Sequence, residues 1–340
     1  MYNEYNSLNK YNKEVKMSSL EVIYIELTDR CNLNCAHCGN GESQNISLPK
    51  SAVKNLISDF ASCGGKKVML TGGEPLLHPD LEEILNFTCP RVEETKISTN
   101  GYLLSEGFDF LFDNDLGFKI SIDGTREIHN SIRKNPESYD RIVSAINKIS
   151  DKKKNLTLRT TLMRENKDSV IPMLFELSKI SNGIERINIW PVRQIGRAAQ
   201  NSVLSPFEYK DFLHRLAKST KGVNLGFGIV VGPVFGIEDI FAGTPIKKDD
   251  IYTCNLLKKT LEVSPKGEVY PCSFVRSSLG SIYDKSILEI FHSPKANKFR
   301  ELVGNIREPR CSKCESYSFC KGGCLAESLG SSSRDIYCFR

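Results

Sequence analysis

The sequence lacks the features that would place it in a membrane, outside the cell or on a nucleic acid. No apolar run reaches the roughly 20 residues of a membrane-spanning helix. Residues 1–16 are rich in Asn, Tyr, Lys and Glu and contain no secretory h-region. The formal net charge of +5 is spread over segments of mixed sign, and the one tight basic run, residues 152–154, falls in an expected loop. We therefore expect a cytoplasmic protein that binds neither membrane nor nucleic acid.

Cysteine, by contrast, is abundant, with 12 in 340 residues. Disulfides are unstable in a reducing cytosol, so this density indicates metal or cluster binding. Hydrophobic residues make up 40% of the chain, enough for a sizeable core, and the length suits one large domain with a smaller one. Cys63 and Cys89 lie at the ends of expected elements and are interpreted as structural thiols. The other cysteines form two fields.

The first field is a loop that follows an expected strand over residues 21–27. It contains Cys31, Cys35 and Cys38. A four-iron cluster normally takes four thiolates, so three cysteines leave one iron able to bind a ligand that is not protein. The alternative is a structural zinc ion, for which His37 would have to supply the fourth ligand from inside the loop. The spacing favours the cluster.

The spacing Cys31-x3-Cys35-x2-Cys38 resembles the signature of the radical S-adenosylmethionine (radical SAM) superfamily. Flanking residues strengthen the resemblance: Thr28, Arg30, Asn32 and Leu33. Gly39 departs from it, because many relatives carry an aromatic residue there. The resemblance implies that S-adenosylmethionine binds the open iron through its amino and carboxylate groups. It also implies that one electron then breaks a carbon–sulfur bond, giving a 5′-deoxyadenosyl radical that abstracts a hydrogen atom.

Expected strands and helices alternate over the first two thirds of the chain. Short apolar runs predict strands over residues 21–27, 67–71, 95–98, 118–122, 156–162 and 186–190. Apolar residues at helical spacing predict helices over residues 50–62, from 80, over 139–149, over 170–177 and from 206. The last of these opens at Ser205 with a capping box and a proline in its first turn. This alternation of six strands with helices predicts an α/β fold, a partial (β/α)6 TIM-type barrel.

In such barrels the working groups lie on loops at the carboxyl ends of the strands. Gly72, Gly73 and Glu74 follow the second strand. The glycines would allow a close backbone approach to a ligand, and Glu74 could accept hydrogen bonds from an ammonium group. Taken alone, a Gly-Gly pair after a strand is more often a plain turn. Downstream of the cysteine loop, these residues resemble the GGE motif of the family, which contacts the methionine amino group of S-adenosylmethionine.

The third and fourth expected strands end in polar groups suited to ribose and amino-acid recognition: Ser98, Asn100, Ser121 and Asp123. By resemblance, Ser121 and Arg133 would hold the ribose or carboxylate of the cosubstrate. A guanidinium can bind a carboxylate through two parallel hydrogen bonds, although Arg133 could equally be a surface arginine at a helix start. His129 is interpreted as structural. Residues 196–198, Gly-Arg-Ala, resemble a segment that closes the core in relatives.

The second field has seven cysteines in the last quarter of the chain: Cys254, Cys272, Cys311, Cys314, Cys320, Cys324 and Cys338. A hairpin-like stretch over residues 261–270 precedes the second of them. The part from residue 311 onward, taken alone, would suit zinc as well as iron. Together with the upstream cysteine loop, the spacing resembles the SPASM extension of radical SAM enzymes, which holds two auxiliary iron–sulfur clusters.

Two four-iron clusters would take eight thiolates, and this field has seven, so one iron should have no cysteine. The family pattern assigns the outer cluster to Cys311, Cys314, Cys320 and Cys338. It assigns the inner cluster to Cys254, Cys272 and Cys324, so the missing thiolate falls there. Substrate, water or another side chain could complete it. The cofactors expected are therefore three [4Fe-4S] clusters and S-adenosylmethionine.

We expect a polar tail over residues 1–20, a radical SAM core over 21–225, a connecting region over 226–253 and a SPASM domain over 254–340.

Relatives with this extension mainly modify ribosomally made peptides, so the first hypothesis is a peptide-maturing enzyme. About twenty residues precede the first strand, too few for a separate leader-peptide domain. The second hypothesis is an oxidase or decarboxylase of a small molecule or tetrapyrrole. The third is an iron–sulfur electron carrier. For the enzymes, a reductase such as flavodoxin or ferredoxin is expected.

Overall fold

The computed structural model describes residues 20–105, 107–180, 183–232, 237–246, 257–305, 311, 313–315, 317–320, 323, 324, 326 and 335–339. Cys254 and the expected N-terminal tail, apart from residue 20, lie outside these ranges.

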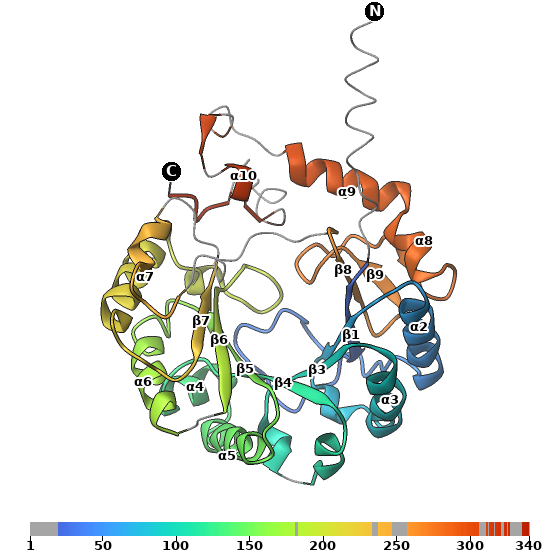
Figure 1. Cartoon of the computed structure of the whole chain (residues 1–340), viewed down its shortest axis with the longest axis horizontal. Coiled ribbons are helices and arrows are strands. Elements are labelled where there is room, and N and C mark those ends of the chain that lie inside the picture. The colour runs from blue at the N-terminus through green and yellow to red at the C-terminus, as the bar shows by residue number, and fades with distance from the viewer. Residues whose placement is uncertain are drawn as a thin grey trace, which may run out of the picture.

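The strands form one ten-stranded sheet in the order β10-β9-β8-β1-β2-β3-β4-β5-β6-β7. Its centre is the six predicted strands, all mutually parallel: β1 (Val22–Thr28), β2 (Lys67–Gly72), β3 (Glu94–Thr99), β4 (Leu116–Ser121), β5 (Leu156–Leu162) and β6 (Ile184–Pro191). The sheet curves around an inner face, and the helices that alternate with its central strands cover its outer face (Figure 1). The predicted α/β fold is confirmed.

The helices follow the predicted pattern closely. They are α2 (Lys50–Ser62), α3 (Leu81–Thr88), α4 (Arg126–Arg133), α5 (Ser138–Asp151), α6 (Val170–Ile180), α7 (Pro206–Thr220), α8 (Ile287–Phe291), α9 (Pro294–Asn305) and α10 (Tyr317–Cys320). The capping box between Ser205 and Glu208 at the start of α7 is present. No helix in the described ranges is both long enough and apolar enough to cross a membrane.

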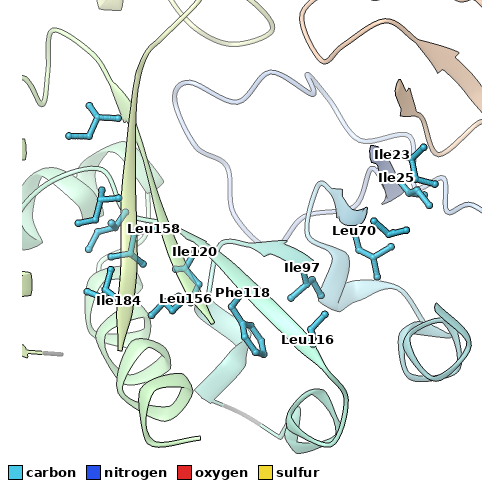
Figure 2. Close-up of a cluster of buried hydrophobic side chains, with 14 of the residues drawn as sticks. Ile23, Ile25, Leu70, Ile97, Leu116, Phe118, Ile120, Leu156, Leu158 and Ile184 are labelled. Carbon is cyan, nitrogen blue, oxygen red and sulfur yellow. The ribbon is translucent and has the colours of Figure 1, made fainter. Parts of the chain in front are cut away.

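The core lies between the sheet and these outer helices. Alternate residues of each strand, such as Ile23 and Ile25 in β1, are fully buried and pack with the apolar faces of the helices. Figure 2 shows the branched and aromatic side chains that neighbouring strands contribute to this layer. The residues between them therefore point to the inner face of the sheet.

The sheet extends beyond the six predicted strands on both sides. β7 (Gly228–Val231) pairs with β6 and lies in the expected connecting region. A four-residue strand is too short to produce a clear periodic signal, so the sequence did not reveal it. On the other side, β8 (Thr260–Val263) pairs in parallel with β1, and β9 (Glu268–Tyr270) and β10 (Gly280–Ser281) follow in antiparallel order. The predicted hairpin over 261–270 is thus present and continues the barrel sheet.

Candidate functional site

The rim of the barrel brings together residues from the ends of four strands. Asn100, after β3, lies with its Nδ2 atom 3.9 Å from Cys31 Sγ and 2.8 Å from Asn32 Oδ1. Arg133, at the end of α4, lies with its NH1 atom 3.7 Å from Cys35 Sγ. The parallel strands all present their carboxyl ends at this edge, which is why segments so far apart in sequence meet here.

Arg197 of the Gly-Arg-Ala segment donates hydrogen bonds to backbone carbonyls of the cysteine loop. Its Nε atom donates to the carbonyl of Cys35 at 3.1 Å, and NH1 donates to that of Gly41 at 2.7 Å. Its backbone N–H donates to the carbonyl of Cys38 at 2.9 Å. Gly196 has a φ of +61°, and a Cβ there would lie 2.4 Å from the Cys38 carbonyl oxygen. The segment after β6 therefore fixes the path of the loop between its second and third cysteines.

Arg133 is buried, which excludes the alternative of a surface arginine. Its NH2 atom forms an ion pair with Asp123 Oδ2 at 2.6 Å. Asp123 is fully buried, and its other carboxylate oxygen accepts the backbone N–H of Thr161 at 2.9 Å. Burial alone would raise the pKa of Asp123, but the guanidinium lowers it, so the carboxylate stays ionised. Asp123 thus orients Arg133. A direct role of either residue in cosubstrate binding remains a prediction.

His129 is structural in the way the sequence indicated. Its Nδ1 atom accepts the backbone N–H of Asp123 at 3.1 Å, and Nε2 lies 3.0 Å from Ser138 Oγ. Burial lowers its pKa to about 3, so the ring is neutral. It therefore supports the turn after β4 that carries Asp123.

Glu74 is fully buried, with its carboxylate engaged by the protein itself. Oε1 accepts the hydroxyl of Thr99 at 2.7 Å and the backbone N–H of Leu76 at 3.2 Å. Oε2 accepts the backbone N–H of Asn100 at 2.8 Å. Burial raises the pKa of Glu74 to about 7. The side chain ties the loop after β2 to the loop after β3, and a contact with an ammonium group remains a prediction.

Gly72 and Gly73 are required by a close approach within the protein. A Cβ on Gly73 would lie 2.2 Å from the carbonyl oxygen of Arg30, and one on Gly72 would lie 2.3 Å from that of Thr28. The backbone N–H groups of Gly73 and Glu74 donate to these same two carbonyls at 2.7 Å each. The glycines therefore let the β2 loop lie directly against the base of the cysteine loop.

The second cysteine field is linked to the barrel by Asp335, which is 1% exposed. Its Oδ2 atom accepts the backbone N–H of Cys324 at 3.0 Å and lies 3.3 Å from Arg193 NH2, just beyond β6. Its Oδ1 atom accepts the backbone N–H of Tyr337 at 2.9 Å. The Tyr337 ring packs on Tyr209 of α7, with centroids 4.5 Å apart. The segment with Cys324 and Cys338 is thus anchored on the barrel.

Two family models match the chain, one over the first cysteine field and one over the part of the second field up to residue 315. The model described as the radical SAM superfamily matches residues 25–177, and SPASM, an iron-sulfur cluster-binding domain, matches residues 254–315. This chain is a radical SAM enzyme with a SPASM domain. The resemblance drawn from the cysteine spacing is confirmed, and the enzyme class with it.

Most of the length of this radical SAM enzyme is similar to proteins that are named for different products. The AdoMet-dependent heme synthase of Methanosarcina barkeri is 28% identical over 87% of this chain and 89% of that protein. The antilisterial bacteriocin subtilosin biosynthesis protein AlbA of Bacillus subtilis is 25% identical over 90% of this chain and 67% of that protein. The crystal structure of Streptococcus suis SuiB bound to precursor peptide SuiA has the same fold, with a TM-score of 0.77, 17% identity and coverage of 100% of this chain and 81% of that chain.

The first cysteine field of the radical SAM enzyme fits an iron–sulfur cluster. Its three cysteines lie on one loop, and three thiolates bound to different irons of a four-iron cluster would leave the fourth iron without a protein ligand. Burial raises the pKa of the Cys31 thiol to about 11. Donors from Asn100 and Arg133 face the Cys31 and Cys35 sulfurs, which suits a thiolate ligand.

The sequence missed three residues of this framework. Asp335 and Arg193 were not recognised, because nothing in their neighbourhood forms a motif and their ion pair joins segments 142 residues apart. Asn166 was also missed, although its Nδ2 donates to the carbonyls of Asp123 and Thr161 at 2.8 Å each. Such partners are visible only once the strands are placed side by side.

Replacing Gly73 by alanine is expected to lower the rate of S-adenosylmethionine cleavage about 10-fold to 100-fold, because the β2 loop must move away from Arg30 and displacements near 1 Å have such effects. The rate is measured as 5′-deoxyadenosine formed by anaerobic protein with dithionite. Gly39→Ala is the matched control, since a Cβ there meets nothing within 4 Å. Equal rates for the two variants would contradict the packing role of Gly73.

Proposed function

We propose that this enzyme cleaves S-adenosylmethionine with one electron to a 5′-deoxyadenosyl radical, which abstracts a hydrogen atom from a ribosomally synthesised peptide or protein and leads to an oxidative cross-link, a thioether or a related change. One observation carries the proposal: Cys31, Cys35 and Cys38 share a single loop, and two side chains from elsewhere converge on that loop, Asn100 after β3 and Arg133 at the end of α4.

The residues of the chain have distinct tasks in this proposal. The three cysteines of the first field hold the cluster that leaves one iron open. Ser98, Asn100, Ser121 and Arg133, together with the backbone of Gly72 and Gly73, form the surface for S-adenosylmethionine. Glu74 and Asp123, whose carboxylates are buried among protein donors, fix the positions of Asn100 and Arg133. Arg133 is suited to a carboxylate because its guanidinium is already oriented when the ligand arrives.

We assign two auxiliary clusters to the second field, so that three clusters are present in all. The outer cluster takes Cys311, Cys314, Cys320 and Cys338, and the inner one takes Cys254, Cys272 and Cys324. The anchoring of Cys324 through Asp335 to Arg193 supports a position for the inner cluster beside the barrel. An auxiliary cluster there could accept the electron left on an oxidised substrate, and a flavodoxin or ferredoxin would supply the first electron.

A peptide substrate is supported by two of the similar proteins. AlbA is named for the biosynthesis of a bacteriocin, and SuiB has been solved with its precursor peptide. A small-molecule substrate is the second candidate, because the heme synthase is similar over nearly the whole chain.

The proposal includes the domain limits given above, with the radical SAM core over residues 21–225 and the SPASM domain over residues 254–340.

The test uses anaerobically reconstituted protein with dithionite and S-adenosylmethionine. We expect 5′-deoxyadenosine to form, and we expect a peptide encoded beside the gene to change mass in step with it. If nucleoside forms and only a tetrapyrrole precursor is altered, the second candidate is correct. If no nucleoside forms although the clusters are intact, the chain is an electron carrier and the proposal fails.

A further inference from the structure

A positively charged region lies on the inner face of the sheet, below the rim. Lys119 in β4 lies between Phe118 and Ile120, which are fully buried in the layer under the helices, so its side chain points to the opposite, inner face. In the next strand, Arg159 pairs in register with Ser121. The two cations therefore lie diagonally on adjacent strands, which run side by side in Figure 1.

Lys96 adds a third positive charge to this face. Gly117 makes room for it, because a Cβ at Gly117 would lie 2.9 Å from Lys96 Cγ. The Lys96 ammonium is compensated, since its Nζ atom lies 2.7 Å from Glu94 Oε1. Lys119 has no such partner: within the residues that the structure describes, no hydrogen bond or ion pair engages its Nζ atom.

The protein thus keeps a partly buried lysine beside two other cations. Burial, followed by the charges of Arg159 and Lys96, lowers the pKa of Lys119 to about 7. The acidic pair of the same face does not relieve this, because Glu26 and Glu262 both contact Arg276, at 2.5 and 3.3 Å. A carboxylate placed beside Lys119 and Arg159 would give Lys119 the anionic partner that it lacks among the described residues.

We propose that Lys119 and Arg159 form an anion subsite on the inner face of the barrel that binds a carboxylate of the substrate. The subsite lies two residues before Ser121, about 7 Å below the rim at the usual rise along a strand. A substrate held there would place neighbouring atoms toward the cosubstrate surface. The inference rests on the proposed function, since it concerns the substrate of that same reaction.

The neighbouring groups favour a carboxylate within a peptide. Asn188, the register partner of Arg159 in β6, has a buried Oδ1 atom that accepts no hydrogen bond from the described residues. In a bound peptide, the backbone N–H next to an acidic side chain could donate a hydrogen bond to Asn188 Oδ1 after a small movement of the Asn188 side-chain amide. The Arg159 guanidinium also lies 5.2 Å from the Trp190 ring, which makes the indole sensitive to events at the subsite.

Trp190 is the single tryptophan of the chain, so its fluorescence reports on this region alone. The reconstituted protein is titrated at constant ionic strength with acetyl-glutamate amide, with its glutamine counterpart and with glutarate. We expect a saturable change with the two carboxylates and none with the glutamine compound. Lys119→Met should weaken carboxylate binding about tenfold or more, since it removes a charged hydrogen-bond donor, and Lys119→Arg should restore most of it.

Lys266→Met, in the exposed turn between β8 and β9, is the control and should bind like the parent. Stronger binding of acetyl-glutamate amide than of glutarate supports a peptide carboxylate, and the reverse supports the carboxylate of a small molecule. No saturable change in the parent, or equal binding by Lys119→Met, would overturn the inference. The titration needs no reductant or S-adenosylmethionine, so its failure is distinct from a failure to form 5′-deoxyadenosine.

Discussion

Replacing Cys31, Cys35 and Cys38 together by alanine should lower the iron content from about twelve to about eight atoms per chain, because one of the three proposed four-iron clusters is lost. Cleavage of S-adenosylmethionine should fall to the background of the reductant alone. The two measurements are iron and sulfide analysis of anaerobic protein and chromatography of 5′-deoxyadenosine. The remaining iron should still give the absorption of oxidised clusters, since the second field is untouched.

The matched control replaces Cys63 and Cys89, which are partly buried and pack against the hydrophobic core. This variant should keep all of its iron and its cleavage activity. A parent with about eight irons would contradict the count of three clusters while leaving the radical site intact. Zinc in the first field, or a triple variant that still cleaves S-adenosylmethionine, would contradict the assignment of that field.

Asp123→Ala should lower the free energy of unfolding by about 3–5 kcal/mol, because it leaves the buried Arg133 cation without its partner. Both side chains of the pair are nearly inaccessible, at 0% and 7% exposure, so water cannot replace the carboxylate. The measurement is anaerobic urea denaturation followed by circular dichroism. The effect is large because the penalty comes from the orphaned charge as well as from the lost contact.

A second aspartate–arginine pair provides the control. Asp140 pairs with Arg126 on the surface, with side chains 58% and 50% exposed, so Asp140→Ala should cost less than about 1 kcal/mol. The double variant Asp123→Leu with Arg133→Met should recover much of the stability, since it removes both charges. If Asp123→Ala costs no more than Asp140→Ala, the pair does not bear the structural role given to it here.

Much of the architecture could be predicted because its signals are local. The predicted helix over residues 50–62 matches α2, and the predicted strand over 156–162 matches β5. Both have apolar residues at one clear period and are bounded by turn residues. The cysteine loop could be recognised because cluster ligands lie a few residues apart in one segment. Strands with parallel order also place such loops on one rim, so a position of Asn100 near the cysteine loop followed from the fold class, whereas Arg133 could equally have been a surface arginine.

The orientation of individual side chains could not be predicted in the same way. The contact of Glu74 with an ammonium group stays a prediction, but nothing in the sequence indicated that its carboxylate would also accept hydrogen bonds from Thr99 and Asn100. The approach of a ligand to Gly73 likewise stays a prediction, whereas its packing against the Arg30 carbonyl became visible only in the structure. In both cases the residue type was informative, but its partner comes from a neighbouring strand. The sequence contains no local sign of which group occupies that place.

What the sequence by itself determined is the chemistry: a three-cysteine loop, a seven-cysteine field and an alternation of strands and helices that carries them. These depend on spacing over a few residues, which the covalent chain sets directly. Only the tertiary structure decided that β7 and β8 widen the sheet, that Asp335 joins the second field to Arg193, and that Lys119 and Arg159 share the inner face. Those arrangements arise from pairing and burial between distant segments, whose free energy exists only in the assembled fold.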